Sequence, residues 1–468
     1  MRRGFVAVLV AGILMTTAFA AVSASVLAKP GQDLIAVSEP APSAAPKEWT
    51  FMVYLDADNN LEPYAFMDLE EMQDVGSTDK VNIVVLMDMW TTFPDCTHWF
   101  YISGTKETHV DVEVGVIECD CIMFVEEDDC CKELNMADGK NLTNFIVKSV
   151  TKFPADNYVL VLWDHGGGWR GVCWDDHSFL SDGRVDRLTT PETATAIEDA
   201  IGILAEDAIN FKVSILAYDA CLNGVVDVVY ENRFAADYMV ASMTLVPAYG
   251  MDYYAFLLAL TADPSMTVEA AGTKMVDTFV DSYSFCAGGG IGSSLGDVGM
   301  ALIDLSKANA LGTAMYYLSK ELYDNYVDDY RFRGAIESSE SQTPMLQRTG
   351  EQIAYTDLGL FASLLAEKIP EIYTLATAVA TAVDYAVVYC RYVQTESGAV
   401  IRTTGISVYF TCCYDKLWLD YAYDTPEETP ETEVAYFGWD FTRYTYWDEV
   451  LMEFTMAITP GEPTEPIE

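Results

Sequence analysis

Two apolar runs of the sequence each end in a side chain that could take part in nucleophilic catalysis. The segment 159–164 is followed directly by His165, and the segment 213–220 is followed directly by Cys221. Groups at the carboxyl ends of neighbouring parallel strands face one crevice, where ligands bind. An imidazole and a thiol placed there can act as base and nucleophile without being close in sequence. The pattern therefore predicts a cysteine–histidine dyad.

The residues beside this dyad suit acyl transfer. Gly166 and the two glycines after it have no β-carbon, so a substrate backbone can approach and N–H groups can face a developing oxyanion. A helix is expected to start at Leu222, and its dipole would favour the thiolate of Cys221. A single buried cysteine or histidine is usually structural. Two such strand ends in one βαβαβ unit favour catalysis instead.

Segments typical of strands and of helices alternate along most of the chain. Buried strands are expected at 50–55, 81–87, 157–164, 213–218, 237–242, 300–304 and 406–410. Helices are expected at 61–75, 141–153, 191–207, 222–231, 266–284, 306–327 and 355–390, with a loop at 165–190. This alternation predicts an α/β fold with a doubly wound, mostly parallel sheet flanked by helices, followed by a more helical C-terminal part.

The composition changes towards both ends of the chain. Residues 1–28 combine basic residues with an apolar stretch and small residues, which predicts a secretory signal peptide, with an uncleaved anchor as the alternative. Residues 29–47 contain several prolines and predict a linker or pro-segment. The remaining segments are a folded domain at 48–458, divided into a core at about 48–250 and a C-terminal subdomain at about 251–458, and a flexible acidic, proline-containing tail at 459–468.

The chain is strongly acidic, with 72 acidic and 26 basic residues and a formal net charge of −46. This charge repels phosphate backbones, so nucleic-acid binding is not expected. No segment after the N-terminal one reaches the roughly 18 uninterrupted apolar residues of a membrane span. Together with the signal peptide, these features predict a secreted, extracellular protein; retention at the cell surface is the alternative if the N-terminal segment stays uncleaved.

Eleven cysteines are present, and five of them lie within 92–135, which we interpret as an irregular insertion or hairpin. In an exported protein most cysteines form disulfide bonds, and an odd number leaves at least one free thiol, for which Cys221 is the candidate. A metal–thiolate module is the alternative for this segment, although its spacings match no standard zinc site. Its candidate ligands are Cys119, Cys121, Cys130 and Cys131 with His98 or His109.

The chain resembles the clostripain family of cysteine peptidases, relatives of caspases, legumain and gingipains. The family pairs a hydrophobic block ending in Asp-His-Gly with another ending in Asp-Ala-Cys, and residues 164–166 and 219–221 match these endings. Further segments similar to the family are 49–64, 154–176, 302–308, 355–361 and 404–410. The resemblance implies a caspase-like fold over 48–458 and a secreted thiol protease that is made as a zymogen.

The resemblance also assigns roles to single residues. It implies that Cys221 is the nucleophile, that His165 protonates the leaving amine, and that the N–H groups of Gly166 and Cys221 form an oxyanion hole. Asp219 matches the position that receives a basic P1 side chain, so cleavage of protein or peptide substrates after Arg or Lys is expected. Capping of the following helix by Asp219 is the alternative. Segment 240–253 resembles the wall of the specificity pocket, with valine and methionine where the family usually has Glu and Trp.

Processing and cofactor use are further expectations from the family. Self-cleavage at Arg184 or Arg187, in the loop after His165, would give two associated chains. The chemistry requires no cofactor, but some relatives depend on calcium; residues 56–62 do not match a calcium-binding loop, so the sequence locates no metal site. Two alternatives stay open: the same dyad with Asn or Asp at P1, and a non-catalytic extracellular binding protein on a peptidase fold.

Overall fold

The structure, a computed structural model, describes residues 45–90, 97–103, 133–180, 183–284, 297–342, 355–394, 403–410 and 439–458. All of these residues belong to one compact unit. The predicted signal peptide, most of the predicted linker and the C-terminal tail lie outside the described residues, as does most of the cysteine-rich insertion. Within the described ranges, no helix is both long enough and apolar enough to cross a bilayer.

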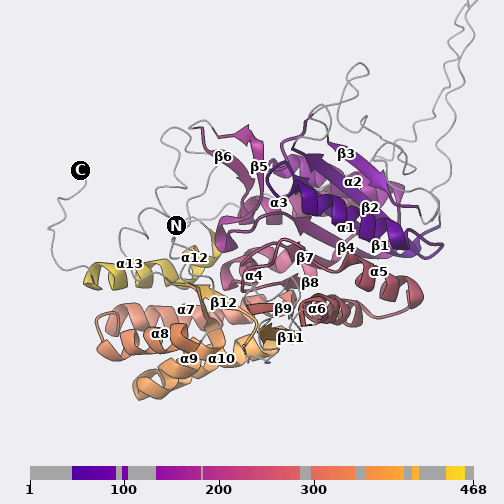
Figure 1. The fold of residues 1–468 in the computed structure, drawn as a ribbon. Coiled ribbons are helices and arrows are strands. Elements are labelled where there is room, and N and C mark those ends of the chain that lie inside the picture. Colours follow the sequence, from indigo (N-terminus) through magenta and orange to yellow (C-terminus); the bar gives the residue numbers. More distant parts are fainter. Residues whose placement is uncertain are drawn as a thin grey trace, which may run out of the picture. The chain divides into compact units, whose positions relative to one another are not determined.

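Eight strands form one mixed sheet in the order β11-β9-β8-β7-β4-β1-β2-β3, and their course can be followed in Figure 1. The strands are β1 (Lys47–Ala57), β2 (Val81–Met89), β3 (His98–Tyr101), β4 (Ala155–Trp163), β7 (Val213–Asp219), β8 (Ala236–Ala241), β9 (Asp297–Asp304) and β11 (Val387–Gln394). The pairs β2–β1, β1–β4, β4–β7 and β7–β8 are parallel, whereas β3, β9 and β11 pair antiparallel at the edges. The predicted α/β class is confirmed, with antiparallel strands added on both sides.

The central strands are almost wholly apolar because helices cover both faces of the sheet. Every residue of β2 is buried, and residues of β1 alternate between two hydrophobic cores, with Val53 in one and Tyr54 in the other. One core contains α1 (Glu62–Val75), α5 (Tyr253–Ala262) and α6 (Val268–Ser284). The opposite core contains α2 (Gly139–Lys152), α3 (Thr190–Glu206), α4 (Val226–Glu231) and α7 (Ala308–Asn325). The sheet is therefore doubly wound, as predicted.

The chain beyond residue 250 supplies both helices and strands. It contributes β9 and β11 to the main sheet, and β10 (Tyr355–Asp357) pairs with β12 (Ser407–Tyr409) in a separate two-stranded sheet. The remaining helices pack into the same core as α7, namely α8 (Tyr330–Gln342), α9 (Leu358–Lys368), α10 (Tyr373–Ala386), α12 (Asp440–Thr445) and α13 (Trp447–Ile458). Helix α5 was not expected from the sequence.

The single helix predicted at 355–390 is wrong. Asp357 ends β10 and caps α9, its carboxylate accepting a hydrogen bond from the Leu360 N–H at 2.9 Å. Pro370 then interrupts the helical run, because proline lacks an N–H and disfavours helical geometry in the residue before it. After α10 the sequence turns to β-branched and aromatic residues, which form β11.

The loop predicted at 165–190 is also wrong. It contains an antiparallel hairpin of β5 (Val172–Phe179) and β6 (Val185–Leu188). Strand β5 escaped prediction because polar residues occupy positions that normally carry apolar ones; Asp175, for example, is fully buried. Helix α4 begins at Val226 and not at Leu222, which has a φ of 68° and therefore lies in the left-handed region.

Candidate active site

The ends of β4 and β7 lie at the same level of the sheet. Trp163 pairs with Asp219 in the parallel register, and the Asp164 N–H donates to the Asp219 carbonyl at 3.3 Å. His165 and Cys221 each follow a paired residue by two positions, so both leave the sheet at its carboxyl edge. The structure thus brings the two residues of the predicted dyad to neighbouring strand ends.

Gly166 packs directly against the backbone of Cys221. A β-carbon at Gly166 would lie 2.2 Å from the Cys221 carbonyl oxygen and 2.5 Å from the Cys221 nitrogen. Real side chains do not tolerate such distances, so only glycine allows the two strand-end loops to approach this closely. The two residues predicted to donate to an oxyanion are therefore in contact.

Cys221 is a free, partly exposed thiol. Its Sγ lies 3.3 Å from the Val246 nitrogen, whose N–H donates to it. Burial raises the pKa of this thiol to about 11, the nearby carboxylates of Asp219 and Asp164 add to the rise, and the N–H groups of Val246 and Gly166 oppose it. The protein therefore holds a thiol at neutral pH before substrate binds.

The expected stabilisation of the Cys221 thiolate by a following helix is wrong. Helix α4 begins only at Val226, and the chain passes through a turn at Leu222 in between. The effect of a helix dipole falls off within the first turn, and its favourable end must face the charge. The backbone N–H groups of Val246 and Gly166 stabilise the thiolate of Cys221 instead, although they only partly offset the effect of burial.

His165 is held by a residue that sequence reasoning missed. Its Nε2 lies 2.9 Å from Oδ1 of Asn60, which belongs to the turn after β1. Because an amide oxygen only accepts, Nε2 carries the proton in this contact, and Nδ1 of the neutral ring is left as an acceptor. Burial lowers the pKa of His165, which keeps the ring neutral, and Asp176 opposes this effect. No signal in the sequence indicated this contact, because it depends on the pairing of β1 with β4 in the sheet.

Asp219 is buried close to Cys221 in the chain, and only one of its two carboxylate oxygens accepts hydrogen bonds from described residues. Its Oδ2 accepts hydrogen bonds from the Met251 N–H and the Tyr253 hydroxyl, both at 2.9 Å. Its Oδ1 is buried and has no hydrogen-bond partner among the described residues. Burial raises the pKa of this carboxyl group to about 6, and the two hydrogen bonds oppose the rise. The segment 246–253 therefore contacts both the thiol and this carboxylate.

Two acidic residues of α1 interact electrostatically with Asp219. Asp68 accepts a hydrogen bond from Nε1 of Trp163 at 2.6 Å, and burial together with Asp219 raises its pKa well above the ordinary value. Burial likewise raises the pKa of Glu71 to about 6, and Asp219 contributes to that rise. A cation beside Asp219 would relieve this repulsion.

A family model for the clostripain family matches residues 53–453. The chain belongs to the clostripain family. A curated relative, clostripain of Hathewaya histolytica, is 32% identical over 232 residues, which cover 44% of this chain and 40% of that protein. The match therefore spans less than half of the relative's length.

Solved structures of the clostripain family share the fold. One is a secreted C11 cysteine protease from Bacteroides thetaiotaomicron bound to an irreversible peptide inhibitor, 17% identical, with a TM-score of 0.51 over 86% of this chain and 99% of that one. Another is an inactive zymogen C11 protease from Parabacteroides distasonis, 18% identical, with a TM-score of 0.57 over 86% and 99% of the two chains. The fold expected from the family resemblance is confirmed.

The two candidate processing residues lie in the β5–β6 hairpin. The carbonyl of Arg184 accepts from the Leu180 N–H at 2.8 Å at the turn of the hairpin, next to an exposed glycine. Arg187 lies within β6, and its Nε donates to the Arg170 carbonyl at 3.0 Å. The structure therefore gives the two arginines different settings, one at a turn and the other in a paired strand.

The cysteines that the structure describes are all free thiols: Cys173, Cys221 and Cys390. The other eight cysteines lie outside the described residues, and so does His109. His98 lies on β3, where its ring stacks on Phe100 with centroids 5.9 Å apart. Disulfide bonds and the metal–thiolate alternative both stay predictions.

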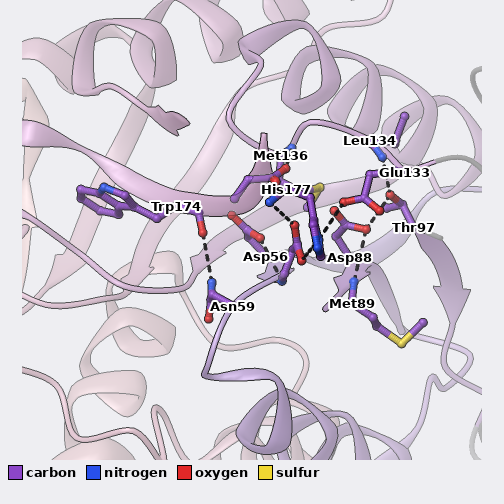
Figure 2. A network of polar contacts seen from close by, with 12 residues as sticks. Asp56, Asn59, Asp88, Met89, Thr97, Glu133, Leu134, Met136, Trp174 and His177 are labelled. Atoms are coloured by element: carbon purple, nitrogen blue, oxygen red, sulfur yellow. Dashed lines mark hydrogen bonds and ion pairs between the residues drawn. The ribbon is translucent and has the colours of Figure 1, made fainter. Parts of the chain in front are cut away.

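A group of carboxylates that sequence reasoning missed lies beside the candidate active site. The acid cluster comprises Asp58, Asp88, Glu133 and Asp175, each of which has an oxygen within 4.8 Å of the others'. Figure 2 shows Asp88 and Glu133 converging beside the ring of His177, whose Nδ1 lies 2.7 Å from Oδ1 of Asp58. Burial raises the pKa of Asp175 to about 7, and its contact with Asp58 adds to the rise. The four residues come from separate segments of the chain, so they form no motif of fixed spacing that could be recognised in the sequence.

The acid cluster is linked to the turn that follows β4. Nδ2 of Asn59, the residue after Asp58, donates to Oδ1 of Asp164 at 2.7 Å and to the Trp174 carbonyl at 3.2 Å. Figure 2 shows the second of these bonds. Asp164 precedes His165 directly, so the position of the imidazole is coupled through Asn59 to the position of the cluster.

Proposed function

We propose that this protein is a cysteine endopeptidase that uses Cys221 and His165 as its catalytic dyad. The observation that carries the proposal is the parallel pairing of Trp163 with Asp219, which sets the imidazole and the thiol at adjacent strand ends. Membership of the clostripain family supports the same activity. A non-catalytic binding role would leave this arrangement, and the free thiol within it, without a purpose.

The geometry supports a mechanism in which the proton moves only when substrate is bound. Sγ of Cys221 attacks the scissile carbonyl carbon while its proton passes to Nδ1 of His165, whose Nε2–H is held by Asn60. The oxyanion that forms faces the N–H groups of Gly166 and Cys221. The tetrahedral intermediate collapses as the imidazolium protonates the leaving amine, and His165 then activates a water molecule that hydrolyses the thioester.

The proposed P1 preference is for arginine or lysine. The buried Oδ1 of Asp219 can accept a charge-assisted hydrogen bond from a cationic side chain, which would also offset the repulsion from Asp68 and Glu71. An acidic P1 side chain would meet the same carboxylates as like charges. Asparagine or aspartate at P1 is therefore the weaker alternative.

We further propose that the protein cleaves itself at Arg184. A peptidase needs to bind its substrate in an extended, unpaired form, and the turn of the β5–β6 hairpin separates from its partner more easily than Arg187 within β6. Purification of the Cys221→Ala protein tests this proposal. Recovery of two chains from that variant, with no other peptidase present, would rule out self-processing.

Export is part of the proposed function. Residues 1–28 have the composition of a signal peptide, and a solved relative is described as secreted. Determination of the N-terminus of the protein recovered from culture medium tests the assignment. An intact N-terminal segment in a cell-bound fraction would favour surface retention.

The decisive experiment profiles cleavage of matched fluorogenic peptides that differ only at P1: arginine, lysine, citrulline, asparagine or aspartate. The wild type should prefer the cationic substrates, and Cys221→Ala should lose on the order of 10⁴-fold in turnover because the dyad acts as a unit. Cys390→Ala is the matched control, since it removes another free thiol of the described chain. Equal turnover by the wild type and Cys221→Ala would refute the proposed function.

A further inference from the structure

The proposed peptidase chemistry makes no use of the acid cluster, although the cluster is costly to bury. Asp58, Asp88 and Asp175 are all fully buried. Like charges this close destabilise a fold unless a counter-charge is present. In the part of the chain that the structure describes, no lysine or arginine forms an ion pair with any of the three, and Asp58 is paired only with His177. Among the described residues, the three aspartates therefore have no lysine or arginine as a positive partner.

One carboxylate oxygen of Asp88 is buried without a hydrogen-bond partner among the described residues. Its Oδ1 accepts hydrogen bonds from the Thr97 hydroxyl at 2.8 Å and from the Met89 N–H at 3.2 Å. Its Oδ2 is buried and has no hydrogen-bond partner among the described residues. Figure 2 shows this carboxylate directed towards Glu133 and His177. A buried oxygen with free lone pairs is therefore aimed into the cluster.

We propose that the acid cluster binds one divalent cation of the calcium type. All four members offer carboxylate oxygens, the hard donors that Ca²⁺ prefers. Oxygens lie about 2.3–2.6 Å from a bound Ca²⁺, so two oxygens on opposite sides of the ion are about 5 Å apart. The separation of at most 4.8 Å between the cluster oxygens fits that shell. Calcium, expected at first only from the family resemblance, thus matches donors of this chain.

The cation would fix segments that position the dyad. The cluster joins the turn after β1, strand β2, strand β5 and Glu133, and the Asp58 carbonyl accepts from the Asp176 N–H at 2.9 Å. The same turn carries Asn59, bonded to Asp164, and Asn60, bonded to His165. A bound cation would therefore hold the imidazole in place without touching substrate.

Calorimetric titration of the full-length Cys221→Ala protein, which cannot process itself, tests binding directly. After treatment with a chelator, Ca²⁺, Mg²⁺, Mn²⁺ and Zn²⁺ are each titrated. Asp88→Asn should lose one Ca²⁺ site or weaken it at least about 10-fold, whereas Asp237→Asn, which removes a surface carboxylate, should bind as the parent does. Equal Ca²⁺ binding by Asp88→Asn and its parent would overturn the proposal, as would tighter binding of Zn²⁺ at the same site.

Thermal unfolding provides a second test, because a metal ligand and a purely structural residue predict opposite changes in Tm without Ca²⁺. Ca²⁺ should raise the Tm of the parent protein in a concentration-dependent way, because a ligand that binds only the folded state stabilises it. In chelator, Asp88→Asn should unfold at the same or a higher Tm than the parent, because it removes a buried like charge. A Tm that is lowered equally with and without Ca²⁺ would assign Asp88 a purely structural role and refute the proposal.

Glu133→Gln provides a second test of the site in case Asp88→Asn does not fold. Glu133 is only partly buried, so its amide variant should fold and still weaken Ca²⁺ binding. An effect of Ca²⁺ on turnover by the wild type rests on the proposed function, but binding and Tm do not. Absence of peptidase activity with Ca²⁺ binding intact would therefore refute the proposed function alone, and absence of binding in an active enzyme would refute this inference alone.

Discussion

Gly166 lies so close to the backbone of Cys221 that a β-carbon on it would come within 2.2 Å of the Cys221 carbonyl oxygen. The contact joins the turn after β4 to the turn after β7. It sets the spacing between the imidazole, the thiol and the N–H groups proposed to bind the oxyanion.

Substitution of Gly166 by alanine should therefore damage catalysis. The backbone of one turn must move, and displacements of about 1 Å at a catalytic site cost on the order of 10²-fold in kcat. Overpacking should also lower the free energy of unfolding by about 1–3 kcal/mol. Steady-state kinetics and urea unfolding measure both effects.

Gly202→Ala is the matched control for that variant. Gly202 lies in helix α3, and a β-carbon there would meet nothing within 4 Å. This variant should keep full activity and gain about 0.5–1 kcal/mol in stability, because alanine favours helices over glycine. Unchanged kcat in Gly166→Ala would show that the close approach is not needed for catalysis.

Asn60 should act as a positioning residue for His165. Asn60→Ala removes the acceptor of the Nε2–H, so kcat should fall by about 10–100-fold with little change in KM. The imidazolium also loses a partner, so the acid limb of the rate profile should move to lower pH. Asn60→Asp should move it to higher pH, because a carboxylate raises the pKa of a neighbouring imidazole.

Opposite shifts in the two Asn60 variants distinguish positioning from a general structural role. Asn325→Ala, on the exposed surface of α7, should leave the profile unchanged. Identical profiles for the wild type, Asn60→Ala and Asn60→Asp would show that the contact with His165 has no influence on the reaction.

Asp219→Asn should reduce selectivity for cationic substrates. The amide keeps an oxygen to accept from the Met251 N–H but removes the negative charge. We expect kcat/KM for P1 arginine to fall by about 30–10³-fold, equivalent to about 2–4 kcal/mol, with a smaller change for P1 citrulline. Asp237→Asn serves as the control, and an equal loss with both substrates would place Asp219 outside the P1 site.

The preference for P1 arginine over citrulline should depend on pH. The pKa of Asp219 is raised to about 6, so its carboxylate is ionised above that pH and neutral below it. The ratio of kcat/KM for the two substrates should therefore rise with pH through about 6 and level off above 7. Asp219→Asn should give a flat ratio, and a flat ratio in the wild type would contradict the assignment.

Much of the architecture followed from local patterns in the sequence. Continuous apolar runs predicted β1, β2, β4 and β7, because a strand buried on both faces needs no polar residues. The same patterns failed at β5, where buried aspartates replace apolar residues, and at 355–390, where Pro370 and the β-branched residues after α10 divide the expected helix.

The sequence alone was sufficient to propose His165, Cys221 and Asp219 as site residues, because each ends or follows a recognisable strand and matches a family motif. Only the tertiary structure placed Asn60 on the imidazole and gathered the acid cluster, since the order β2-β1-β4-β7 brings together turns that are far apart in the chain. Local patterns report which residues a strand buries. Which strand ends meet depends on pairing between distant segments, and the residues brought together in this way have no fixed separation in the sequence.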